Sequence, residues 1–480
     1  MASYTTEIAQ SLPFHEVPVG QELIVGLSNE LCVAEEQNVK FCFNIYVGDN
    51  SITASSIGIF KTTPNNAGVG LLDVNRILEN YVSADNIATD DSSFKINGGY
   101  SQDIPIHLID KYSRSKNAVR YFTIVGYTEF TDSSNAIVAT ANVTVASGRI
   151  NNGYVKHSDA IKFVIETWMG AAYGFGYSLE DYGIKKTETK KFLTNAPSTQ
   201  YVRAEDYGTL SFLAISSFSS NLCDVKEYEV KMYKADDTVL TSYNVPRTTQ
   251  TGGFTGFTQV GGAMQNRILY IAACPANLKV NSTFNTHLEG NLAYYTIRLL
   301  DDVGDAVSET RRFDILCPNL KQYKPIRLTW LNQFGTWDYY TFNQKSVRSI
   351  ATKSTTYQQL GGTWNSSTYN PQGYKGGTKS FRVNASEKIR MNTDYITEEH
   401  TDWFEELVNS PEVYMLKDWE LPRQQSSAGT QTSERKVLNQ EVMPVRLTTT
   451  NFTKKTVAND KLIQYTFEVE KSKTLRTQAI

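Results

Sequence analysis

The sequence has few of the residues from which metal centres and disulfide frameworks are built. Only 5 of its 480 residues are Cys and 5 are His. The cysteines are odd in number, lie far apart and include no CxxC pair, which argues against a disulfide framework or a zinc site and fits folding in a reducing cytosol. The histidines form no HxH or HExxH pattern, so no metal-ligating pair is indicated. We therefore predict no cofactor and no metal site.

An excess of charge of one sign and long apolar runs are also missing. The formal net charge is −3, so no basic field indicates nucleic-acid binding. No apolar run is long enough to span a bilayer. Residues 1–15, MASYTTEIAQSLPFH, contain neither the basic nor the apolar segment of a signal peptide. We expect a soluble protein with no nucleic-acid specificity and no membrane insertion.

Common catalytic signatures are missing too. The chain has no GxSxG motif and no Walker-type loop. The Gly-rich run at 169–183 contains a GxG-like string, but it lacks the strand–turn–helix context of a phosphate-binding loop. Cys317 has no His or basic residue beside it, so a buried thiol is expected rather than a nucleophile. We predict no catalytic residues and no enzyme. A polysaccharide depolymerase with a carboxylate pair in a cleft stays open as an alternative.

Aromatic residues, by contrast, are abundant. Tyr 28 and Phe 22, against Met 7, favour β-structure over helical bundles. The densest aromatic segment is Pro325–Phe342, PIRLTWLNQFGTWDYYTF. Its turn-like middle, Asn332–Gly335, separates two strand-like halves, so it predicts a β-hairpin whose rings form part of a core. The alternative is an exposed platform on which a sugar or a base could stack.

The length predicts about three domains, and the patterns predict a mainly β protein with minor α-structure. We expect an N-terminal β-rich domain at 1–150, a mixed connecting segment at 151–204, an immunoglobulin-like or fibronectin-like β-sandwich at 205–319 and a C-terminal α+β domain at 320–480. The sandwich is inferred from short strands separated by turn signals. A cluster of Gly and Asn at 148–153 marks the first boundary.

Periodicity places the individual elements. Helices are predicted where apolar residues recur at helical spacing, at 71–82, 158–168 and 397–409. Strands are predicted at 22–25, 39–46, 104–109, 119–130, 136–145, 209–215, 225–233, 268–272, 293–299, 327–330, 337–342, 344–357, 378–391, 412–416, 442–448 and 462–471.

Most of the ionisable residues that are candidates for a metal or catalytic site lie in the helix predicted after Thr397. Thr397 is expected to be its N-cap, and Trp403 and Leu407, four residues apart, are expected to pack on the aromatic hairpin. His400 is expected on a solvated face rather than at a metal. The pairs Glu398-Glu399 and Glu405-Glu406 are expected to be ordinary helix surface, with a catalytic acid/base couple as the alternative.

Three polar segments predict long loops: Pro246–Gly262, Leu360–Gly377 and Pro422–Lys436. Ordering such segments costs backbone entropy, which contacts with a neighbouring subunit could offset. The second loop contains Trp364, Tyr369 and Tyr374, whose rings could stack on sugars. A receptor-binding or glycan-binding tail adhesin is therefore an alternative to an assembly subunit.

The C-terminal third carries a family resemblance. It contains, in order, PIRLTWLNQFGTWDYYTFN, a Tyr/Gly/Asn-rich loop, TDYITEEHTDWFEELVNSPEVYML, a polar insertion, and PVRLTTTNFTKKTVANDKLIQYTFEVEKSKTLRTQ. Over residues 321–478 this order resembles virion proteins of tailed phages of Bacteroidetes, including crAss-like phages. The resemblance implies a structural subunit of the virion tail or head–tail connector, assembled in the host cytoplasm. Its partners would be copies of itself in a ring and other tail or portal-proximal proteins.

Overall fold

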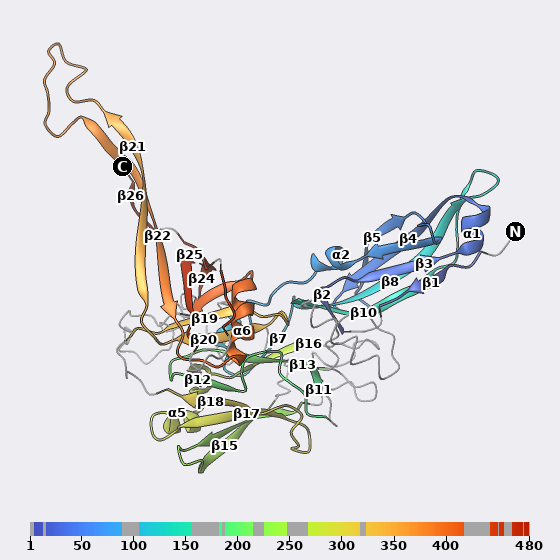
Figure 1. The fold of residues 1–480 in the computed structure, drawn as a ribbon, viewed down its shortest axis with the longest axis horizontal. Coiled ribbons are helices and arrows are strands. Elements are labelled where there is room, and N and C mark those ends of the chain that lie inside the picture. Colours follow the sequence, from blue (N-terminus) through green and yellow to red (C-terminus); the bar gives the residue numbers. More distant parts are fainter. Residues whose placement is uncertain are drawn as a thin grey trace, which may run out of the picture. The chain divides into compact units, whose positions relative to one another are not determined.

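The computed structural model of the chain describes residues 4–12, 16–88, 105–154, 182–184, 188–214, 225–246, 267–316, 323–416, 442–449, 451–455, 463–473 and 475–479. Of these residues, 52% are in strands and 11% in helices. The strands form several separate sheets (Figure 1). The predicted mainly β, multi-domain character is therefore confirmed.

The chain divides into two compact units. The first consists of Met1–Leu316 together with Leu331–Asp338 and Ala428–Asn439. The second consists of Cys317–Trp330, Tyr339–Ser427 and Gln440–Ile480. The finer predicted boundaries, at residues 150, 204 and 319, stay predictions.

Two sheets with a common core form the N-terminal part of the first unit. The smaller sheet has the order β1 (Glu7–Gln10), β3 (Ile24–Ser28) and β6 (Val69–Asp73). The larger has the order β2 (Glu16–Gly20), β10 (Val143–Tyr154), β8 (Val119–Thr131), β4 (Gln37–Gly48) and β5 (Ser55–Thr62), with β9 (Ile137–Ala139) on β8. Val25 and Leu27 from the small sheet and Phe41, Phe43 and Ile124 from the large one belong to one buried cluster. The short helices α1 (Glu30–Glu35) and α2 (Asn75–Glu79) complete this part.

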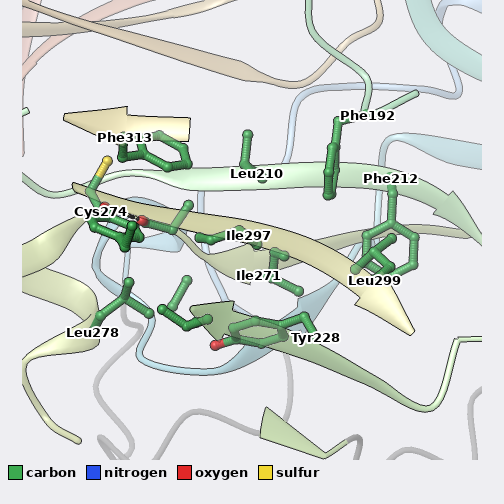
Figure 2. Close-up of a cluster of buried hydrophobic side chains, with 14 of the residues drawn as sticks. Phe192, Leu210, Phe212, Tyr228, Ile271, Cys274, Leu278, Ile297, Leu299 and Phe313 are labelled. Carbon is green, nitrogen blue, oxygen red and sulfur yellow. Dashed lines mark hydrogen bonds between the residues drawn. The ribbon is translucent and has the colours of Figure 1, made fainter. Parts of the chain in front are cut away.

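A second pair of sheets forms the rest of the first unit around another core. One sheet has the order β11 (Gly183–Ile184), β13 (Thr209–Ala214), β16 (Arg267–Ala272) and β7 (Tyr112–Arg114). The other has the order β12 (Thr199–Val202), β18 (Arg311–Ile315), β17 (Tyr294–Leu300), β14 (Glu227–Tyr233) and β15 (Val239–Pro246). Figure 2 shows their shared core, to which Leu210, Phe212 and Ile271 come from the first sheet and Tyr228 and Ile297 from the second. The helices α4 (Pro275–Leu278) and α5 (Ser282–Leu288) lie between β16 and β17 in the chain.

This second pair of sheets is a β-sandwich, because alternate residues of its strands meet in one core. It contains parallel pairs, β11 with β13 and β12 with β18, and it takes strand β7 from residues that we assigned to the N-terminal domain. The immunoglobulin-like character of the sandwich stays a prediction.

The second unit is built on one eight-stranded sheet. Its order is β20 (Trp337–Phe342), β19 (Ile326–Leu331), β23 (Val413–Leu416), β24 (Val442–Leu447), β25 (Thr466–Lys471), β22 (Gly377–Asn392) and β21 (Val347–Gln359), and β26 (Leu475–Ala479) pairs with β22. Among the described residues of this unit, the longest helix is α6 (Glu399–Asn409). The predicted combination of strands with one amphipathic helix is present.

Two predicted elements are wrong, and sheet pairing explains the first. Leu71 and Leu72 were expected to begin a helix, but they lie in β6 and pair with β3, so the helix is reduced to α2. The predicted strand 104–109 is instead a helical turn, Ile106–Leu108. The Gly and Asn cluster at 148–153, from which the first boundary was inferred, lies within β10, which pairs with β2 and β8 there; the domain boundary itself stays a prediction. The helix predicted at 158–168 lies outside the described residues.

Candidate interaction surface

The aromatic segment at 325–342 is a hairpin with buried rings, formed by β19 and β20. Trp330 and Phe342 are fully buried. The ring centroid of Trp330 lies 5.0 Å from that of Trp403 on α6, and that of Phe342 lies 5.8 Å from that of Phe467 on β25. The predicted core hairpin is confirmed, and so is the packing of Trp403 against it. Leu407 is buried, and its contact with the hairpin stays a prediction.

The turn of this hairpin is occupied by structural hydrogen bonds. The backbone N–H of Thr336 donates to Oδ1 of Asn332 at 3.1 Å. The Asn332 amide and the Thr336 hydroxyl both donate to the carbonyl of Leu193 at 2.9 Å. The indole N–H of Trp337 donates to the carbonyl of Asp85 at 2.9 Å, and its side chain is 2% exposed. These groups hold the first unit together, so the turn offers no aromatic platform.

His400 is half-buried, so the predicted solvated position is only partly correct. Its ring centroid lies 6.1 Å from that of Trp403 and 6.4 Å from that of Phe404. Burial lowers the pKa of His400 to about 4, since the charged imidazolium loses hydration there. The N-cap position is Glu398, which makes no side-chain capping bond. The Thr397 hydroxyl, predicted to be the cap, lies 3.0 Å from Nδ1 of His400 instead.

The glutamate pairs of α6 are only partly helix surface. Glu398 and Glu399 are exposed, as expected. Glu405 is half-buried and forms an ion pair with Lys454 at 2.8 Å. Glu406 is buried, because it follows Trp403 by one helical turn and lies on the same side of the helix. The prediction that both members of the second pair are solvated is wrong for Glu406.

The hairpin of β21 and β22 contains a long exposed strand. The two strands pair from Val347–Arg390 to Gln359–Gly377, with one register shift between Thr355 and Thr356. We call residues 347–390 the arm. In β21 the first ten residues are all exposed, so both faces of the strand meet solvent. Core packing begins only near the base of β22, where Ala385, Ile389 and Met391 are buried. Figure 1 shows this hairpin extending beyond the other strands of its sheet.

The tip of the arm is a loop with a defined conformation. The backbone N–H of Thr363 donates to the carbonyl of Asn370 at 3.1 Å, and the N–H of Asn370 donates back to the Thr363 hydroxyl at 3.0 Å. Within this frame the side chains of Trp364, Tyr369 and Tyr374 are 81%, 65% and 72% exposed. The tip therefore presents three rings to solvent, as the adhesin alternative requires, on a loop ordered by its own hydrogen bonds.

The other features predicted from the sequence add no functional site among the described residues. Cys317 and the loops at Pro246–Gly262 and Pro422–Lys436 lie outside the described residues, apart from Pro246, the last residue of β15. In the described ranges, no three His, Cys, Asp or Glu side chains are placed to hold a metal ion. Within that same part of the chain, none of the helices has both the length and the apolar composition to cross a bilayer.

The extent of the arm was not recognised from the sequence, although a signal existed. We predicted two strands around a loop, but the segment VRSIATKSTTYQQ lacks the alternation of apolar and polar residues that a strand with one buried face requires. A strand of this composition has no core face, which indicates an exposed edge strand. No family model matches the sequence, and no curated protein matches it either.

Proposed function

We propose that this chain is a structural subunit of a bacteriophage virion, which forms an oligomeric ring in the tail or head–tail connector. The observation that carries the proposal is the arm, a long hairpin whose strand β21 has ten consecutive exposed residues and whose outer part, residues 356–381, pairs with no third strand of the described residues. Isolated two-stranded ribbons gain little stability in water. Ribbons of this kind suit subunits whose neighbours supply the missing contacts. The resemblance of residues 321–478 to virion proteins of tailed Bacteroidetes phages supports the same proposal.

Two measurements test the proposal. Mass spectrometry of purified virions of the source phage should detect the chain in a fixed ratio to the portal protein. Negative-stain electron microscopy of the purified full-length protein should show rings or other closed oligomers, since wide side-to-side contacts of this kind generate closed symmetry. Absence of the chain from purified particles would rule out a virion subunit.

A second candidate, a glycan-binding tail adhesin, is favoured by the exposed rings at the tip. Trp364 is 81% exposed, and aromatic faces stack on the apolar faces of sugars. A glycan array separates the two candidates: specific binding that Trp364→Ala abolishes, and that Tyr201→Ala leaves unchanged, would establish the adhesin. Tyr201 is a suitable control because it is 59% exposed and lies in β12, away from the arm in the chain.

A further inference from the structure

The arm ends its sheet with an open strand edge. β21 is the terminal strand in the sheet order, and it pairs on one side with β22. No strand of the described residues pairs with its other side, so a row of backbone N–H and C=O groups is available for a further strand. Apolar side chains of β21 accompany this edge, with Val347 53% exposed and Ile350 64% exposed.

The arm also differs from the remaining chain in charge. Residues 347–390 contain seven Lys or Arg and one acidic residue, Glu387. The arm therefore carries a formal charge of +6 and, with the whole chain at −3, the other residues carry −9. Arg348, Lys353 and Arg382 are exposed and have no ion-pair partner among the described residues.

We propose that the arm binds an acidic surface on a second copy of this chain, through its basic side chains, the open edge of β21 and the exposed rings of its tip. This inference rests on the proposed function and assigns the contact that joins neighbouring subunits. The opposite charges of arm and remainder would steer the two copies together. The exposed rings are the residue types that most often dominate binding energy at protein interfaces.

A protein partner fits the arm better than nucleic acid. Binding to a phosphate backbone gains affinity with each phosphate that a Lys or Arg neutralises, whereas the seven Lys and Arg of the arm are spread over its 44 residues and only two of them, Arg348 and Lys353, lie on the edge strand β21. An open strand edge and the aliphatic side chains of Val347 and Ile350 have no counterpart on a nucleic acid. They match the mode in which an extended strand adds to the edge of a sheet.

The same charges could have a different role, because Lys and Arg on edge strands prevent indiscriminate pairing. The two roles predict opposite results when the charge is removed. If the charges attract a second copy, their removal weakens self-association. If they only protect the edge, their removal strengthens it.

The test is sedimentation velocity on the purified full-length chain over a range of concentrations. The triple variant Arg348→Gln, Lys353→Gln, Arg382→Gln should weaken self-association at least about tenfold. Raising the salt concentration from about 0.1 M to about 1 M, which shortens the screening length from about 10 Å to about 3 Å, should weaken the wild type and leave the triple variant nearly unchanged.

A matched variant removes the same charge elsewhere. Lys40, Lys116 and Lys226 are exposed and lie outside the arm, so the variant Lys40→Gln, Lys116→Gln, Lys226→Gln, which makes the remainder more negative, should self-associate at least as tightly as the wild type. Equal or tighter association of the arm variant would overturn the assignment of the arm and leave the ring proposal in place. A wild type that stays monomeric at every concentration would overturn both.

A photo-crosslinker placed at Ser354 identifies the partner directly. Ser354 is exposed in the middle of β21, and a crosslink to peptides of another copy, distinguished by mixing isotope-labelled and unlabelled chains, is expected. A mobility-shift assay with a 30-nucleotide DNA probe, single- and double-stranded, tests the nucleic-acid alternative. DNA binding lost in the arm variant, without intermolecular crosslinks, would overturn the proposal.

Discussion

At the scale of single residues, the second unit depends on aromatic side chains that lie far apart in the sequence. Trp403 is 1% exposed, and its ring contacts that of Trp330 at a centroid distance of 5.0 Å and that of Tyr340 at 6.0 Å. Removal of such a ring leaves a cavity that neighbouring rings fill poorly. The aromatic cluster therefore decides whether α6 stays on its sheet.

We predict that Trp403→Ala lowers the free energy of unfolding by about 3–5 kcal/mol. Urea denaturation followed by tryptophan fluorescence and circular dichroism measures the change. Trp364→Ala is the matched control, because Trp364 is 81% exposed and its loss should change stability by less than about 0.5 kcal/mol. A Trp403→Ala variant that unfolds like the wild type would mean that α6 does not pack on the hairpin.

The stability of the fold is also expected to depend on pH through one residue, His400. Burial lowers the pKa of His400 from 6.5 to about 4, so the folded chain keeps the ring neutral while the unfolded chain protonates it at a higher pH. The part of the free energy of unfolding that depends on this ring is complete above about pH 6.5 and is lost as the pH falls from 6.5 toward 4. Below pH 4 the ring is protonated in both states, and the dependence ends.

The His400 prediction is checked by NMR titration of the ring protons in the folded protein, where a pKa near 4 is expected. His400→Phe should remove the dependence of unfolding free energy on pH between 4 and 6.5 that this ring causes. A ring that titrates near its ordinary value in the folded chain would show that His400 is solvated after all.

At the scale of elements, the turn between β19 and β20 has the strictest steric requirement. Gly335 has a φ of +75°, a conformation that L side chains rarely adopt. A Cβ added there would lie 1.9 Å from the carbonyl oxygen of Asn152, which is backbone and cannot move aside easily. Both the conformation and the close approach require glycine.

We predict that Gly335→Ala lowers the free energy of unfolding by about 2 kcal/mol or more, since strain and a backbone clash act together. Gly373→Ala is the control in the arm tip, because a Cβ there would meet no atom within 4 Å. Thermal unfolding of both variants compares them. Similar melting temperatures would indicate that the turn tolerates a different backbone path.

At the scale of the whole molecule, the long polar segments are expected to respond to assembly. We predict that at least two of Pro246–Gly262, Leu360–Gly377 and Pro422–Lys436 are cleaved by a nonspecific protease in the monomer and protected in the oligomer. The reason is that a neighbouring subunit can offset their entropy of ordering, about 1–2 kcal/mol per residue. Equal cleavage in both states would leave them as solvent-exposed insertions.

The sequence by itself determined the β-rich class and most strands, because alternation of apolar and polar residues is a local property. It also determined the hairpin at 325–342, whose apolar rings have no stable place except a core. The helix at 399–409 followed from an apolar stripe three and four residues apart. These features need no knowledge of which segment lies beside which.

Only the tertiary structure decided which strands pair and which residues are covered. Leu71 and Leu72 belong to a strand because β3 lies beside them, and β7 joins β16 across more than 150 positions of the chain. The neighbouring segments likewise decide that Glu406 is buried and that β21 is exposed. Burial depends on what packs against a segment, and no local pattern of residues contains that information.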